Sequence, residues 1–418
     1  MSKKQNPPVS SSSRIPSNLL AVSLGSLFTD ISSEMIFHLL PLYLTNVLGA
    51  KTAVVGLIEG VAESTASLTR LFSGWLSDRL GKRKGLTVFG YSLSAVAKPF
   101  FLIADSWPLV LLLRFADRLG KGIRTAPRDA LVADSVRAES RGFGFGLHRA
   151  ADTLGATIGL GIAAAVAYAA GPSATSLSAE TFHLVIWISI IPAVLGVVSL
   201  MLIARDVPAA DKPKPAAGDS EPMPAPRRAF SPRLIGFFLV IALFTLGNSS
   251  DSFLVLRAQD RGLSVFQVML AIFVFNIVYT LVSMPAGRRS DKIGRGRVLV
   301  AGWLVYGLVY LGFAVAGASW QIWILYALYG LYYAMVEGTA RAYVADLAAA
   351  EHRGTAYGVF NAAVGIMALP ASLIAGVLWQ GAFGWRGFGA AAPFFFGSAM
   401  ALVAVALTVL WLPRLRRE

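Results

Sequence analysis

Long apolar runs dominate the pattern of residues along the chain. The runs Phe182–Ile203 and Phe388–Leu412 each approach the roughly 20 residues that an α-helix needs to cross a bilayer. Gly, Pro and charged residues separate such runs throughout the sequence. The pattern therefore predicts an all-α membrane protein of twelve transmembrane helices, with spans at 17–45, 53–79, 85–104, 107–134, 141–169, 181–204, 232–260, 264–288, 296–317, 320–347, 354–380 and 387–412.

Lys and Arg residues are unevenly distributed among the loops between these spans. One set of loops holds most of them, whereas the opposite set holds Lys51, Arg261 and Arg386. Because cytoplasmic loops are enriched in Lys and Arg, both termini are expected in the cytoplasm, with the chain crossing the inner (plasma) membrane. The predicted organisation is a cytoplasmic tail (1–16), a six-helix bundle (17–204), a flexible Pro-rich linker (205–231), a second six-helix bundle (232–412) and a short tail (413–418).

The composition agrees with a membrane protein and removes several other classes. Only 14% of residues are charged, against roughly 25% in soluble proteins. The formal net charge is +14, but the basic residues lie between apolar runs and not on a soluble basic domain, so no nucleic-acid partner is predicted. The chain has no cysteine, which leaves no disulfide framework and no thiolate metal site. The first apolar segment is longer than a signal-peptide core, so we assign it as the first span.

The two predicted halves repeat one another at an offset of a little over two hundred positions. Weak internal symmetry of this kind is typical of transporters built from repeats. Three segments carry it: Gly74–Arg83 recurs as Gly287–Arg297, Ala133–Asp134 with Arg141–Gly142 recurs as Ala345–Asp346 with Arg353–Gly354, and Phe28–Thr29 with Ser32–Glu34 recurs as Phe244–Thr245 with Ser249–Asp251.

The segment Gly74–Arg83 resembles the signature G-x-x-x-D-R-x-G-R/K-R/K of the major facilitator superfamily, and the resemblance covers essentially the whole chain. It implies two six-helix bundles that rock about a central site lined by the first, fourth, seventh and tenth spans. It also implies that Asp78 and Arg79 take part in a cytoplasmic charge network that latches the outward-facing state. The alternative is that the loop only anchors the topology. The gate residues we expect are Gly74, Asp78, Arg79, Gly81, Lys82, Arg83, Arg128, Asp129 and Asp291.

Ionisable residues recur on one face of the first span. Asp30, Glu34 and His38 are spaced four residues apart, and Asp251 takes the position of Glu34 in the second half. If this face lines the cavity, burial would favour the protonated carboxyl group and allow proton uptake and release. Asp30, Glu34 and Asp251 are therefore proton-coupling candidates. The alternatives are fixed ion pairs with Arg residues of the fourth span, or a divalent cation, which side chains of one helix cannot surround by themselves.

The fourth span is the most highly charged, with Arg114, Asp117, Arg118, Lys121, Arg124, Arg128 and Asp129. Its Arg118–Gly122 segment is similar to the superfamily's R-x-x-Q-G element, with Lys121 in place of Gln. We expect Arg118 and Lys121 either to bind an anionic group of the substrate or to neutralise Asp30 and Glu34. Further substrate-binding candidates, chosen for their polar or aromatic side chains within spans, are His38, Asn248, Asn276, Tyr333, Glu337 and Asn361.

The fifth span offers two weaker signals. Arg149 and Asp152 are three residues apart and are expected to pair locally. Gly155–Gly161 partly resembles the superfamily's antiporter element, but Leu160 replaces its Pro, and close packing of small residues explains the spacing equally well.

The predicted function is secondary active transport by alternating access. No G-x-x-x-x-G-K-[ST], H-E-x-x-H or G-x-S-x-G motif occurs, so neither an enzyme nor an ATP-driven pump is indicated. We expect proton-coupled export of a small organic compound by a monomer in the lipid bilayer, with a small-molecule substrate, protons and no cofactor. The alternative is uptake or efflux of an organic anion, a metal ion or a metal chelate.

Overall fold

The computed structural model describes residues 15–137, 140–207, 230–349, 352–382 and 384–411, and all regular structure within these ranges is helical. The predicted tails and most of the linker lie outside them. The first half contains α1 (Ser17–Phe37), α2 (Leu40–Leu42), the π-helical η1 (Tyr43–Val47), α3 (Thr52–Leu80), α4 (Lys84–Ala97), the 3₁₀-helical η2 (Pro99–Ile103), α5 (Trp107–Ser135), α6 (Arg141–Ala170) and α7 (Ala179–Ile203). The second half contains α8 (Pro232–Gly247), α9 (Ser252–Asp260), α10 (Val265–Ile293), α11 (Arg295–Val315), α12 (Ser319–Leu347), α13 (Arg353–Gln380) and α14 (Ala392–Leu410).

Nine helical stretches within the described ranges are long and apolar enough to cross a bilayer. The predicted integral membrane fold is thus confirmed, while the count of twelve spans and the orientation of the termini stay predictions. Three more helices, α3, α5 and α12, are as long, at 29 residues each. Ionisable residues or tyrosines lower their mean hydropathy, and several of these side chains line cavities between the halves.

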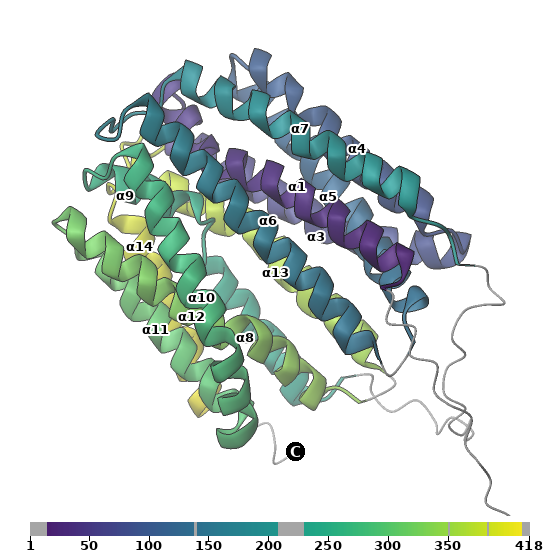
Figure 1. Ribbon diagram of the computed structural model, residues 1–418. Helices are drawn as coiled ribbons and strands as arrows, with labels where there is room; N and C mark the ends of the chain where they lie inside the picture. The colour runs from purple at the N-terminus through teal and green to yellow at the C-terminus, as the bar shows by residue number, and fades with distance from the viewer. Residues whose placement is uncertain (1–14, 138–139, 208–229, 350–351, 383, 412–418) are drawn as a thin grey trace, which may run out of the picture.

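The two halves lie side by side along their helices (Figure 1). We call the end where α1 begins and α7 and α14 end the terminal end, and the opposite end the far end. Gly81, expected to allow a tight turn, caps α3 at the terminal end with a φ of 65°. Within the first half, a Cβ atom on Gly155 would lie 2.4 Å from the carbonyl oxygen of Leu27. Close packing of α6 on α1 therefore accounts for Gly155 and for Gly159, whose Cβ atom would lie 2.5 Å from the Ile31 carbonyl oxygen, whereas Gly161 meets nothing within 4 Å.

The halves are closed against each other at the far end. Here the hydroxyl of Thr52 on α3 donates to the carbonyl of Gly376 on α13 at 2.9 Å, and the Gln259 amide donates to the Asn46 side chain at 2.7 Å. The backbone N–H of Val265 also donates to the Ala174 carbonyl across the halves at 2.9 Å. These bonds join the loops and helix ends that surround the far end of the structure.

Glycine makes the closest approach of α3 and α13 possible. A Cβ atom on Gly56 would lie 2.1 Å from the Ser372 carbonyl oxygen, and one on Gly376 would lie 2.3 Å from the Thr52 carbonyl oxygen. Because backbone lies on the other side of each contact, a larger residue forces the helices apart.

Replacing Gly56 by Val is expected to open the far end. The chain has no cysteine, so Ser249→Cys, which lies in the cavity described below, gives a single reporter thiol. In Gly56→Val, labelling of this thiol by a membrane-impermeant maleimide added on the far-end side should rise severalfold. Gly85→Val is the matched control, because a Cβ atom there has no neighbour within 4 Å. Equal labelling of the two variants would contradict the proposal that close packing of α3 and α13 closes the far end.

Candidate functional site

Most of the candidate residues line three neighbouring cavities between the halves. The central cavity, about 350 Å³, is lined by both halves; the N-half cavity, about 420 Å³, is lined mainly by α1, α3, α5 and α6; and the outer cavity, about 570 Å³, reaches Asp291 and Arg295 at the terminal end. The first two share Glu34, Glu63 and Ser67, and the last two share Arg149 and Tyr279. The cavities thus follow one another from the middle of the structure to its terminal end.

The acidic face of α1 lies on these cavities. Glu34 lines both the central and the N-half cavity, and its carboxylate lies 2.8 Å from the His38 imidazole. Asp30 lines the N-half cavity, and within the described ranges its carboxylate has neither an ion pair nor a hydrogen bond. Across those same ranges, no cluster of three acidic or imidazole side chains that would suit a metal ion is found.

Asp251 occupies a break in the helix at the corresponding place in the second half. Here α8 ends at Gly247 and α9 begins at Ser252, and the intervening residues, 248–251, line the central cavity. The Asp251 carboxylate accepts hydrogen bonds from Tyr329 at 2.7 Å and Tyr333 at 3.4 Å. Interrupted helices at the centre of transporters supply polar backbone groups without exposing them to lipid.

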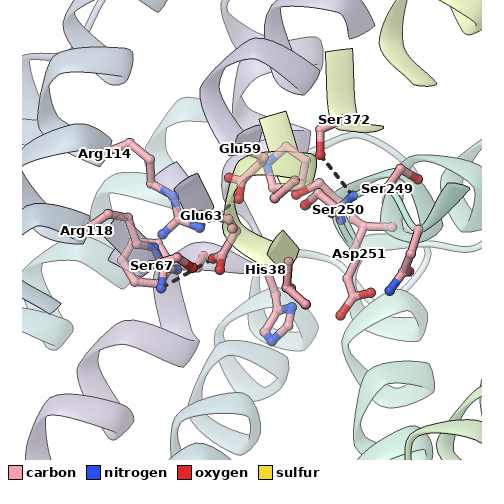
Figure 2. Close-up of a pocket in the computed structure, with 18 of the residues that line it drawn as sticks. His38, Glu59, Glu63, Ser67, Arg114, Arg118, Ser249, Ser250, Asp251 and Ser372 are labelled. Carbon is pink, nitrogen blue, oxygen red and sulfur yellow. Dashed lines mark hydrogen bonds and ion pairs between the residues drawn. The ribbon is translucent and has the colours of Figure 1, made fainter. Parts of the chain in front are cut away.

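Two arginines of α5 and two glutamates of α3 form a buried ionic network. Arg114 and Glu59 pair at 2.9 Å and are almost fully buried, while Arg118 lies 3.7 Å from Glu63. Asp117 lies between the two guanidinium groups, at 3.9 Å and 3.7 Å. Figure 2 shows this network on one side of the central cavity and Asp251 on the other.

The network changes the expectation for Arg118. We expected this residue to bind substrate or to neutralise Asp30 and Glu34, but its ion partners are Glu63 and Asp117. It still lines the central cavity. Sequence reasoning did not include Glu59 and Glu63, although two acids four residues apart in an apolar segment gave the same signal as α1.

The sequence analysis also did not identify a buried lysine. Lys98, at the end of α4, is 1% exposed and donates hydrogen bonds to the hydroxyls of Ser32 at 2.6 Å and Ser33 at 3.1 Å. It lies behind the cavity-facing side of α1 and ties α1 to α4. A charged residue inside a predicted apolar span was the signal available for it.

The remaining substrate-binding candidates are distributed unevenly. Lys121 and Asn276 line the N-half cavity, and Asn248 lines the central cavity. Tyr333 lines both the central and the outer cavity. Asn361 is half-buried on α13 and is not among the residues that line these three cavities.

Arg149 links the two halves instead of pairing within its own helix. Its guanidinium lies 3.7 Å from the Glu337 carboxylate and donates to the Tyr279 hydroxyl at 3.1 Å. The Tyr279 hydroxyl in turn donates to Glu337. The expected local partner, Asp152, lies 3.5 Å from His148. The local pair does not form, because Arg149 reaches across the cavity to the second half while Asp152 lies beside His148, one turn earlier on α6.

The two duplicated loops have the same internal ion pairs. Arg83 pairs with Asp78 at 3.4 Å and with Asp134 at 2.7 Å, and in the second half Arg295 pairs with Asp291 at 3.4 Å and with Asp346. In each half an arginine thus joins the loop after the second long helix to the end of the fourth.

The other expected gate residues lie close to these loops but not in one network. The guanidinium of Arg79 lies over the Trp75 ring, and Gly74 faces Ala126 on α5. Arg128 and Asp129, two of the expected gate residues, pair with each other at 2.9 Å, and Asp129 lies 3.8 Å from Arg70. Lys82 is exposed beside Gly81.

Comparison with known proteins identifies the family. The model of the Major Facilitator Superfamily matches residues 22–257 and 237–418. An uncharacterized MFS-type transporter of Methanocaldococcus jannaschii is 35% identical over 398 residues, 93% of each chain, and the Multidrug resistance protein 2 of Bacillus subtilis is 32% identical over 136 residues, 32% of each chain. The crystal structure of a bacterial homolog of the human lysosomal transporter Spinster, in an inward-facing and occupied conformation, has a TM-score of 0.75 at 16% identity, covering 95% of this chain and 96% of its own. The resemblance seen in the sequence is confirmed: the chain belongs to the Major Facilitator Superfamily of membrane transporters.

Proposed function

We propose that this protein is a monomeric, proton-coupled secondary transporter that exports a small organic compound across the inner membrane by alternating access. Both termini then lie in the cytoplasm, and the conformation described here is inward-facing. Two observations support this assignment: the halves are closed together at the far end, and the cavities continue to the terminal end. Alternating access requires a central site that opens to one side at a time.

Under this proposal α3, α5 and α12 are also membrane spans, which brings the total to twelve. Each is 29 residues long, enough to cross a bilayer even when tilted. Glu59, Arg114 and Tyr333, one from each helix, line the central cavity. Polar groups that face a protein cavity do not meet lipid, so a lower hydropathy is compatible with spanning.

Proton coupling is carried by one observation: the Asp30 carboxylate lines the N-half cavity and forms no ion pair or hydrogen bond with a described residue. A carboxylate inside a membrane span that has no ion pair is costly in its ionised form, and protonation removes that cost. Glu34 and Asp251 differ, because His38 or tyrosine hydroxyls already contact their carboxylates. We therefore assign the main proton site to Asp30 and supporting roles to Glu34 and Asp251.

Export is favoured by the relatives and by the chemistry of the first span. Proteins named as multidrug resistance proteins match about a third of the chain. A carboxylate that takes up a proton from one side and releases it to the other provides the counter-movement that drives efflux. The second candidate function, transport of an organic anion, is favoured by Lys121 and Arg124, two cations that line the N-half cavity.

The duplicated loops are the proposed cytoplasmic gate. Gly74, Asp78, Arg79, Gly81, Lys82 and Arg83 belong to one loop and its preceding helix, and Asp291 belongs to the other. In the inward-facing conformation each loop is held within its own half by Arg83 or Arg295. When the bundles rock, the exposed Asp78 and Asp291 become available to basic groups of the opposite half, which latches the outward-facing state.

Asp30→Asn is expected to abolish pH-gradient-driven movement of substrate, because the amide cannot take up a proton. The measurement uses proteoliposomes that enclose a mixture of small amines, carboxylates and amino acids, with mass spectrometry of the compounds that move when a pH gradient is imposed. Movement down a substrate gradient should persist in the variant. Glu180→Gln, at an exposed carboxylate outside the cavities, is the control. Full gradient-driven movement in Asp30→Asn would overturn the proton site, and no movement of any compound in the wild type would overturn the transport proposal for these classes.

Glu337→Gln is expected to shift the conformational equilibrium away from the inward-facing state, because it removes the ion pair that Arg149 makes between the halves. Such partly exposed pairs contribute about 0.2–1 kcal/mol, so the ratio of states should change by up to about fivefold. Spin labels on Leu80→Cys and Ile293→Cys, both exposed near the terminal end, report the distance. The double exchange Arg149→Glu with Glu337→Arg should restore the distribution, and Glu180→Gln, which changes an exposed carboxylate outside the cavities, serves as the control. Longer or unchanged distances between the two spin labels in Glu337→Gln would contradict the proposal that this ion pair stabilises the inward-facing state.

A further inference from the structure

Asp251 and Lys121, which have opposite charge and lie on opposite halves, face the inner cavities without an ion partner among the described residues, as does Asp30, the proposed proton site. Asp251 lines the central cavity, and within the described ranges no cationic group lies within 4 Å of its carboxylate. Lys121 lines the N-half cavity, and there its ammonium group has no ion pair or hydrogen bond with a described residue. The other Arg and Lys residues lining these two cavities contact acidic, hydroxyl or aromatic groups.

The surroundings of Asp251 suit an ammonium group. Its carboxylate is held by the hydroxyls of Tyr329 and Tyr333, which fix its orientation and leave it an acceptor. The break also places two helix ends at the central cavity: the carboxyl-terminal end of α8, whose dipole favours positive charge, and the start of α9, whose dipole favours the carboxylate of its N-cap residue Asp251. His38, the nearest basic group on α1 that lines the same cavity, is already 2.8 Å from Glu34.

The surroundings of Lys121 suit a carboxylate or another small acidic group. Arg124 lies one turn further along α5, lines the same cavity and donates to the Ser94 hydroxyl at 2.7 Å, with its guanidinium over the Tyr91 ring. The nearby acid without a partner is Asp30. Lys121 and Arg124 are two cations that form no ion pair with a described residue, and Asp30 is a single acid. A positive charge therefore remains there even when Asp30 is ionised, and an anion is needed to balance it.

One small molecule can reach both positions. The central and N-half cavities are contiguous through Glu34, Glu63 and Ser67, and both acids of this shared wall already have partners, His38 and Arg118. The combined volume of the two cavities is large enough for a small organic compound. The acidic groups on the wall that the two cavities share are therefore paired. The unpaired charges lie elsewhere in each cavity.

We infer that the transported compound is a small zwitterion, with its ammonium group at Asp251 and its acidic group at Lys121 and Arg124. This inference rests on the proposed transport function and names its substrate class. Occlusion brings the halves together and removes water from both charges, which is costly unless each acquires a partner. A simple amine leaves Lys121 unpaired, and a simple acid leaves Asp251 unpaired. A zwitterion pairs both at once while Asp30 is ionised, and Asp30 takes up its proton in the return step, after the substrate has left.

The test compares ω-amino acids with monofunctional compounds of the same length. Glycine, β-alanine, 4-aminobutanoate, 6-aminohexanoate and 8-aminooctanoate are added to the purified protein, with the alkylamine and alkylcarboxylate of each chain length alongside, and affinity is taken from the shift in melting temperature. At the best length the zwitterion should bind about 10- to 100-fold more tightly than either partner compound, as expected for one additional charge-assisted hydrogen bond.

Two variants test which end of the zwitterion each residue binds. Asp251→Asn should remove the advantage of the zwitterion over the carboxylate, and Lys121→Gln should remove its advantage over the amine. Arg341→Gln, which changes a cation lining only the outer cavity, should leave both advantages intact. Amines that bind as tightly as zwitterions would make the substrate an organic cation, carboxylates that do so would make it an organic anion, and no binding by any member of the series would also overturn the inference. Failure of the transport proposal is distinct, because it appears as absence of pH-driven movement of every compound in the proteoliposome mixture.

Discussion

The cost of placing charge inside a membrane governs this structure. An ionised side chain within a span is costly by about 2.5–3.5 kcal/mol on insertion scales, and removing one partner of a buried pair costs about 3–5 kcal/mol. The first half meets this constraint with a network in which Arg114 and Arg118 face Glu59, Glu63 and Asp117. Both guanidinium groups also lie over the Phe37 ring, at 3.8 Å and 4.8 Å from its centre. Because most charges are compensated in this way, the few that are not become the candidates for function.

The second half uses a different chemistry on the same framework. Its cavity wall is backed by packed tyrosines, in which the rings of Tyr306 and Tyr310 stack at 4.1 Å and Tyr329 and Tyr333 meet at 5.2 Å. Aromatic packing gives rigidity without net charge, so Asp251 is the acidic side chain that this half presents to the central cavity. The result is an asymmetric site, with ionic groups concentrated on one wall and a single oriented carboxylate on the other.

The fold combines rigid halves with a seam that allows them to move. Arg83 and Arg295 fix the loops within their own halves, whereas small residues such as Gly56 and Gly376 let α3 and α13 approach closely. Contacts within a half therefore include many ion pairs. Contacts between the halves bring backbone against backbone at the far end and include few ion pairs. Arg149 with Glu337 is an ionic exception that crosses between the halves.

The sequence by itself determined the parts of this protein that depend on local pattern. Apolar run length predicts membrane helices, and the repeated Gly74–Arg83 element predicts the family and the two matched halves, since these signals need only neighbouring residues. It also placed Asp30, Glu34 and His38 on one helical face, because that follows from a four-residue spacing. Partnership between helices was decided by the tertiary structure alone. Arg118 pairs with Glu63, and Arg149 with Glu337, across gaps in sequence that no periodicity connects. Which charges remain unpaired, and hence Asp251 and Lys121 as a complementary pair, depends on how the helices pack around a shared cavity.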